Sequence, residues 1–215
     1  MKKGARIALG TSAATIILTV AVMFGYMFWV GAPTHGPAIG RYERPKTALL
    51  VVDLQEDFTG PDAVKRMKNA DSVVLVAGKM VAMAVGNGQP VAYIRAIYPD
   101  PGVRFVMGGL AAPDEFGSRM DRRLPSVPSI RSFTKTRGDA FSNPSLDAWL
   151  RENQVNHVVV TGIDAFYCVD DTIHGAMNRG YKVTAVMDAI STGTKRDVAT
   201  IAEKWRAAGV EILDN

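Results

Sequence analysis

Cysteine and histidine are scarce in this chain. Cys168 is the single cysteine among 215 residues, and there are only three histidines. A framework of intramolecular disulfides is therefore excluded. A lone cysteine is ordinarily a small, buried, apolar side chain, so a chemical role for Cys168 needs a local argument.

Charge is absent from one part of the chain and balanced in the rest. Residues 7–40 contain no Asp, Glu, Lys or Arg, and Lys2, Lys3 and Arg6 supply three of the four net positive charges. From residue 41 onward, 22 basic residues face 21 acidic ones. No basic stripe with interleaved aromatic residues appears, so the sequence predicts no binding of nucleic acid.

The uncharged run of 24 residues at 7–30 predicts a transmembrane signal anchor, with residues 1–6 as a cytoplasmic head. As a helix it would extend roughly 36 Å, enough to cross a hydrocarbon core of about 30 Å. There are two alternatives, a cleaved signal peptide and a buried helix. The run is too long for a signal peptide and ends in bulky residues. The basic head favours a single-pass membrane protein whose domain is extracytoplasmic. Arg41, Arg44 and Lys46 lie beyond the other end of the run and reduce the difference in positive charge between its two sides. Residues 31–45, rich in Gly and Pro, are expected to be a linker.

From residue 46 the chain alternates short apolar runs with helical patterns. Continuous apolar runs of strand length are typical of strands that are buried on both faces of a parallel sheet. Strands are expected at 47–53, 90–97, 129–134, 157–161, 181–187 and 210–213, and helices at 62–85, 145–153, 168–178 and 195–208. Residues 46–215 should therefore form one α/β domain, a doubly wound, mainly parallel sheet with helices on both faces. Residues 98–128 show no sustained period and are expected to overhang the site.

Three reactive side chains lie at or just after the carboxyl ends of expected strands. They are Asp53, Lys135 and Cys168, and ligands of such sheets bind at that edge. Cys168 also begins an expected helix, where unpaired amides and the helix dipole favour a thiolate. The hypothesis is that Asp53 takes the thiol proton and that Lys135 holds the resulting charge.

Three blocks of sequence carry a family resemblance. VVDLQEDF (51–58), FTKTRGDAFSNPSLDAWL (133–150) and VVVTGIDAFYCVDDTIHGAMNRGYKVTAVMDA (158–189) resemble the three signatures of the isochorismatase-like cysteine hydrolases. That family includes nicotinamidases, carbamoylsarcosine amidase and ureidoacrylate amidohydrolase, and the resemblance covers roughly residues 46–213. It implies hydrolysis of a C–N bond in a small amide, carbamoyl or ureido compound through a thioester, without a cofactor. Relatives are commonly dimers or tetramers, so a homo-oligomer is expected by analogy.

The resemblance also implies roles for particular residues. Asp53, Lys135 and Cys168 match the family's catalytic triad, with Cys168 as nucleophile. The peptide bond between Ile163 and Asp164 matches the family's cis, non-proline bond. It turns the backbone amides of Asp164 and Cys168 toward the substrate oxygen as an oxyanion hole, a kind of contact whose loss lowers rates by a factor of about 100–1000.

The chain also departs from its relatives. Nicotinamidases carry an Asp-x-His metal motif and further histidines after the second strand, whereas the histidines here are His35, His157 and His174, with none in 98–128. No metal site is therefore expected, and a nicotinamidase-type amidase stays an alternative. A non-catalytic, membrane-anchored binding module on the same fold is the second alternative, but such a module would have lost a triad member and none is lost.

Several side chains near the triad are expected to form the walls of a substrate pocket, although each is also an ordinary packing residue. They are Gln55, Phe58, Phe141, Phe166 and Tyr167. The Asp164 carboxylate has two open roles, since it could contact a substrate or cap the helix that follows it.

Overall fold

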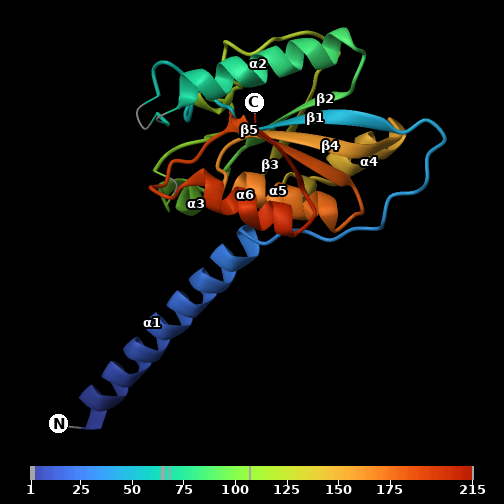
Figure 1. Cartoon of the computed structure of the whole chain (residues 1–215). Helices are drawn as coiled ribbons and strands as arrows, with labels where there is room; N and C mark the ends of the chain where they lie inside the picture. The colour runs from blue at the N-terminus through green and yellow to red at the C-terminus, as the bar shows by residue number, and fades with distance from the viewer. Residues whose placement is uncertain (1–2, 64–65, 68, 107, 215) are drawn as a thin grey trace.

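Figure 1 shows the computed structural model of the whole chain, which describes residues 3–63, 66–67, 69–106 and 108–214. Six strands form one parallel sheet with the order β3-β2-β1-β4-β5-β6. The strands are β1 (Lys46–Val52), β2 (Val91–Ala96), β3 (Arg131–Lys135), β4 (Val155–Gly162), β5 (Lys182–Ile190) and β6 (Glu211–Leu213). All six expected strands are confirmed, with small shifts at their ends.

The sheet is covered by helices on both faces. α2 (Ala70–Gly86) lies on one face, and α4 (Pro144–Glu152), α5 (Cys168–Met177) and α6 (Val198–Ala207) lie on the other (Figure 1). The central strand β1 shows why: alternate residues enter opposite cores, Leu50 and Val52 toward α5 and α6, and Leu49 and Val51 toward α2. Strands of a parallel sheet that are buried on both faces need such a continuous apolar run.

The helices begin where the sequence offers caps. Asn143 accepts a hydrogen bond from the Ser145 amide at the start of α4, and Asp197 accepts one from the Ala199 amide at the start of α6. These side chains satisfy amide donors that a helix leaves unpaired at its first turn. α2 begins at Ala70 rather than at 62, so the expected helix was too long at that end.

The strand order reverses between β1 and β4. β1 pairs with β2 on one side and with β4 on the other, and the chain winds outward in both directions from that point. Gly162 closes β4 with a positive φ of 123°, and a Cβ atom there would lie 2.0 Å from the carbonyl oxygen of Val52. Only glycine fits this close approach. Ligands of doubly wound sheets bind at such a reversal.

The segment without a period contains little regular structure. It holds the short helix α3 (Pro101–Val106) and one 3-10 turn, η1 (Phe116–Ser118), and a second 3-10 turn, η2 (Ala140–Ser142), follows β3. The sequence did not predict α3.

The first helix, α1 (Lys3–Val30), projects away from the domain (Figure 1). Side chains are described only for residues 15, 17–26 and 28–30 of it, so much of the expected span at 7–30 lies outside the described side chains. Within the described part of the chain, no helix combines the length and the apolar character needed to cross a membrane. The expected transmembrane helix is therefore not supported by this structure.

The expected linker at 31–45 lies along the domain and is hydrogen-bonded to it. The amide of Thr34 donates to the Asp139 carboxylate at 2.7 Å, and the amide of Ile39 donates to the Arg179 carbonyl at 2.8 Å. Arg151 donates to the Ala38 carbonyl at 3.0 Å. These contacts make the segment part of the folded surface.

Candidate active site

The fold brings Asp53, Lys135 and Cys168 together at the carboxyl edge of the sheet. Asp53 follows β1, Lys135 ends β3, and Cys168 begins α5 beyond β4. The Lys135 Nζ atom lies 2.8 Å from Asp53 Oδ2 and donates to Cys168 Sγ at 3.1 Å. Its third contact is the carbonyl oxygen of Arg137, also at 3.1 Å. Each of the three ammonium protons therefore has an acceptor.

This cluster is almost completely removed from water. The side chains of Lys135 and Asp53 are 0% and 4% exposed. The second oxygen of Asp53, Oδ1, is buried without a hydrogen-bond partner among the described residues. A buried carboxylate oxygen without a partner is unfavourable, and here it leaves a proton acceptor open in the cluster that contains the thiol.

The electrostatics of the cluster favour a neutral thiol at rest. Burial raises the pKa of the Cys168 thiol to about 12, with the Lys135 ammonium lowering it and the Asp53 carboxylate raising it. Burial alone would lower the pKa of Lys135, but the charge of Asp53 raises it instead, so Lys135 stays protonated. The resting site is thus a thiol beside an ion pair. Burial of the sulfur therefore acts against the thiolate that the start of a helix favours.

The turn between β4 and α5 has the geometry that the resemblance implies. The peptide bond between Ile163 and Asp164 is cis. Neither the amide of Asp164 nor that of Cys168 donates a hydrogen bond to a described residue, whereas the neighbouring amides of Tyr167 and Val169 both donate to the Asp164 carbonyl. Both amides are therefore without an acceptor among the described residues.

The Asp164 carboxylate has a structural role. It accepts hydrogen bonds from the Phe166 amide at 2.9 Å, the Thr192 hydroxyl at 2.8 Å and the Gly193 amide at 2.7 Å. These contacts tie the nucleophile turn to the loop after β5. The expected capping of the following helix is not observed, because α5 begins without a side-chain cap and the carboxylate binds the turn before it instead.

Two of the expected pocket walls are corrected. Gln55 is 0% exposed, and its amide donates to the carbonyls of Ala96 and Ser118 and accepts from the Ala96 amide. Phe141 is 2% exposed and packs on Tyr181, with ring centroids 5.6 Å apart. Both side chains face the protein interior, so neither is accessible to a ligand in this structure.

The other three expected pocket residues keep some exposure. Phe58 is partly buried against Tyr98 and its neighbours. Phe166 is partly buried beneath the guanidinium of Arg196, at 5.0 Å from the ring centroid. Tyr167 is 53% exposed and directly precedes Cys168. They remain candidates for substrate contacts.

Sequence reasoning missed two residues at the site. Tyr98 lies just beyond β2, and the amide of the preceding residue, Ile97, donates to the Lys135 carbonyl at 2.8 Å. Arg137 supplies the carbonyl that Lys135 binds, and its guanidinium lies 4.2 Å from the centroid of the Trp29 ring. The position of Tyr98 directly after the expected strand at 90–97 was a usable signal, but nothing in the sequence pointed to the contact between Arg137 and Trp29.

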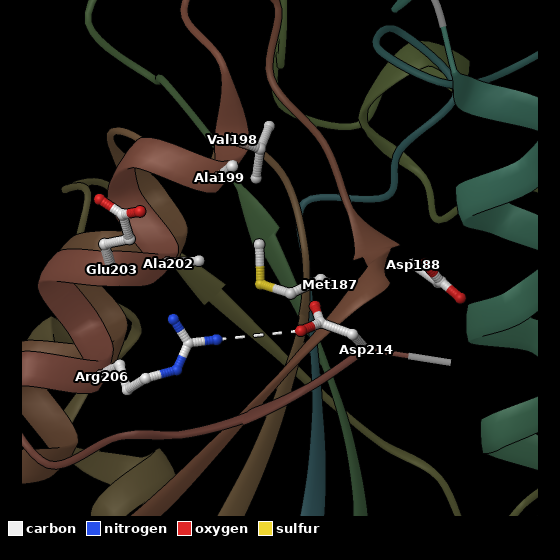
Figure 2. Close-up of a pocket in the computed structure, with 8 residues that line it drawn as sticks. All are labelled: Met187, Asp188, Val198, Ala199, Ala202, Glu203, Arg206 and Asp214. Atoms are coloured by element: carbon white, nitrogen blue, oxygen red, sulfur yellow. Dashed lines mark ion pairs between the residues drawn. The ribbon is translucent and has the colours of Figure 1, made fainter.

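Among the residues that the structure describes, no three His, Cys, Asp or Glu side chains gather as ligands for a metal ion. A separate hollow of about 280 Å³ lies near the carboxyl ends of β5 and β6, against α6 (Figure 2). Its charged side chains, including the Arg206–Asp214 pair at 3.8 Å, are open to solvent. It contains no member of the Asp53–Lys135–Cys168 cluster.

Comparison with known proteins identifies the family of this chain. A family model described as the isochorismatase domain matches residues 47–215. The nicotinamidase of Escherichia coli (strain K12) is 27% identical over 176 residues, which cover 67% of this chain and 82% of that protein. The streptothricin hydrolase of Streptomyces noursei is 30% identical over 176 residues, which cover 78% of this chain and 61% of that protein.

A solved structure supports the same assignment. The N-carbamoylsarcosine amidase from Thermoplasma acidophilum superposes with a TM-score of 0.70 at 26% identity, covering 78% of this chain and 95% of that one. The chain belongs to the isochorismatase family. It is an enzyme, an amidohydrolase of the isochorismatase-like type.

Proposed function

We propose that this enzyme hydrolyses a C–N bond of a small amide, carbamoyl or ureido compound, with Cys168 as nucleophile. The observation that carries the proposal is the buried Asp53 Oδ1 atom without a partner, in a cluster where Lys135 contacts both this carboxylate and the thiol. A neutral thiol needs a base at the moment of attack, and this oxygen is the open acceptor in the cluster.

In the proposed acylation step, the Cys168 proton passes to Asp53 as Sγ attacks the carbonyl carbon. The amides of Asp164 and Cys168 donate to the oxygen of the tetrahedral intermediate. Asp53 then returns the proton to the departing nitrogen, the C–N bond breaks, and ammonia or an amine leaves. The acyl group remains on Sγ as a thioester.

In the proposed deacylation step, Asp53 takes a proton from water, and the hydroxyl attacks the thioester carbon. The C–S bond breaks, the acid leaves, and the proton returns to the sulfur. Lys135 stays protonated throughout, so its charge offsets whichever anion the site holds. The net reaction consumes one water and releases one amine and one acid.

A panel of amides, carbamoyl compounds and ureides, scored for ammonia or amine release, tests the proposal. The Cys168→Ala variant should release no more ammonia or amine than the uncatalysed background. Mass spectrometry of wild-type enzyme quenched with acid should show the added mass of an acyl group on Cys168. Ser72→Ala, on the exposed side of α2, is the matched control and should keep full activity. Equal release by wild type and Cys168→Ala would contradict the proposal and favour the binding module.

Nicotinamide belongs in the same panel. Similarity to the nicotinamidase of Escherichia coli favours it as a second candidate substrate. The absence of histidines from residues 98–128 weighs against it, since the family's nicotinamidases carry metal ligands there.

We also propose that α1 anchors the enzyme in a membrane, with the catalytic domain extracytoplasmic. Large apolar side chains lie exposed around the described half of the helix, with Ile17 at 69%, Phe24 at 68% and Phe28 at 83%. A helix that is apolar on all sides suits lipid or a protein core rather than water. The full chain should stay in the membrane fraction after an alkaline carbonate wash, and protease added to intact cells or spheroplasts should cleave its domain. Release by the wash would contradict the anchor, and protection from protease would contradict the orientation.

A further inference from the structure

A mainly apolar groove lies between the end of α1 and the segment that follows β2. It encloses about 490 Å³, within the range of small-molecule sites. Met23, Tyr26 and Val30 of α1 form one wall, and Tyr98, Val103 and Val106 form the other.

Both walls of the groove attach directly to the strand end that carries Lys135. The Ile97 amide, next to Tyr98, donates to the Lys135 carbonyl at 2.8 Å. The amide of Gly138, three residues after Lys135, donates to the Val30 carbonyl at 2.9 Å. No member of the cluster lines the groove itself, but both of its walls are hydrogen-bonded to the chain at or just after Lys135.

Tyr98 connects the groove to the nucleophile electrostatically as well. Burial raises the pKa of its phenol, the charges of Cys168 and Asp53 raise it further, and that of Lys135 lowers it. One side chain thus lines the groove and lies within range of all three members of the cluster.

The charge of the groove restricts what it can hold. Asp100 is its one charged lining residue, and that carboxylate accepts the Val103 amide at 2.8 Å at the start of α3. No cation lines the described walls to neutralise an acidic ligand. This lining disfavours an anion, and its apolar side chains favour an alkyl group.

We propose that this groove binds the alkyl portion of an uncharged amide substrate whose carbonyl carbon reaches Cys168. The inference rests on the proposed function and adds the substrate class: medium-length aliphatic amides in preference to acetamide-sized ones. It also gives α1 a second role, because its last turns form one wall of the substrate site.

The single cysteine allows a test that does not require turnover. N-ethyl and N-hexyl iodoacetamide alkylate Cys168, and the ratio of their rates reports binding of the chain in the groove. The full chain is measured in phospholipid nanodiscs at a fixed alkaline pH, without free detergent that would fill the groove. Each methylene buried strengthens binding by up to roughly fourfold, so the hexyl reagent should react at least about tenfold faster.

Two variants in opposite walls address the groove itself. Val106→Asp and Tyr26→Ser should each reduce the hexyl-to-ethyl ratio toward one, and both positions are exposed enough, at 61% and 45%, to tolerate the change. Met83→Asp, 66% exposed on α2, is the matched control and should keep the wild-type ratio. A ratio that is equal in wild type and both wall variants reflects partition into lipid alone and would overturn the inference.

Amide turnover separates this inference from the proposed function. The ratio of kcat/KM for N-hexylacetamide to that for N-ethylacetamide should fall in Val106→Asp in parallel with the alkylation ratio. Hydrolysis of amides with no preference for length would overturn the groove and leave the proposed function standing. A length preference in alkylation with no amide hydrolysed would overturn the proposed function, and with it the assignment of the groove to a substrate.

Discussion

Two regions near the carboxyl edge of one sheet hold pairs of opposite charge, and they differ in burial. Lys135 and Asp53 lie 2.8 Å apart with side chains 0% and 4% exposed, whereas Arg206 and Asp214 lie 3.8 Å apart at 56% and 70% exposed (Figure 2). Water screens the second pair, so its attraction is weak. The buried Lys135–Asp53 pair is not screened in this way, and the Oδ1 atom of Asp53 has no hydrogen-bond partner among the described residues. The difference indicates that burial, rather than the type of residue, separates a reactive site from an ordinary surface.

The largest expected effect is that of Asp53→Asn on turnover. Loss of the base should lower kcat/KM by roughly 100- to 10,000-fold. The same change removes a negative charge that raises the pKa of Cys168 from its ordinary value. The pKa of the thiol should therefore fall, and alkylation by iodoacetamide at neutral pH should become faster while hydrolysis becomes slower.

Asp188→Asn is the matched control, because Asp188 is an exposed carboxylate lining the hollow near β5 and β6. It should change neither turnover nor the pH profile of alkylation. Parallel slowing of alkylation and hydrolysis in Asp53→Asn would show that the carboxylate activates the thiol at rest.

The second effect is that of Lys135→Met on stability. It leaves the buried Asp53 carboxylate without its cation, which should lower the free energy of unfolding by about 3–5 kcal/mol. Because Lys135 lowers the pKa of Cys168, its loss should raise that pKa further, opposite to the effect of Asp53→Asn. Urea unfolding and the pH profile of alkylation measure the two quantities. Lys79→Met, the same change at an exposed position on α2, should alter neither.

The smallest effect belongs to the exposed pair. Arg206→Ala should change the free energy of unfolding by less than about 0.5 kcal/mol and leave hydrolysis unchanged. A loss comparable to that of Lys135→Met, measured in the same urea titrations, would remove the distinction between the two regions.

The sequence predicted the sheet and the residues at its edge because both depend on patterns that local sequence carries. A strand such as Leu49–Val52, buried on both faces, is a continuous apolar run, and a residue that follows such a run must lie at the carboxyl edge. The direction of a side chain at that edge is set by tertiary contacts. This is why Gln55 and Phe141 were wrongly expected in the pocket: a hydrogen-bond network holds one and a second aromatic ring packs on the other.

Two other features lay beyond sequence patterns. Residues 98–128 take their form from contacts such as the Tyr98 amide donating to the Ala111 carbonyl at 2.9 Å, which no periodicity reveals. The pKa of Cys168 depends on how completely the site excludes water, whereas the sequence showed only that a helix begins there. Long-range packing decides both.

The contacts of residues 31–39 determine how freely the domain can move relative to α1. A flexible tether of about ten residues would let its ends separate by roughly 16–19 Å on average and in any direction. Here Arg137 binds the carbonyls of Trp29 and Ala32, Asp139 binds Thr34, and Arg179 binds Ile39, so no such free length is left. These contacts therefore hold the helix in a fixed orientation relative to the catalytic edge of the sheet. Inserting residues into this segment would not lengthen the reach of the enzyme until those bonds were also removed.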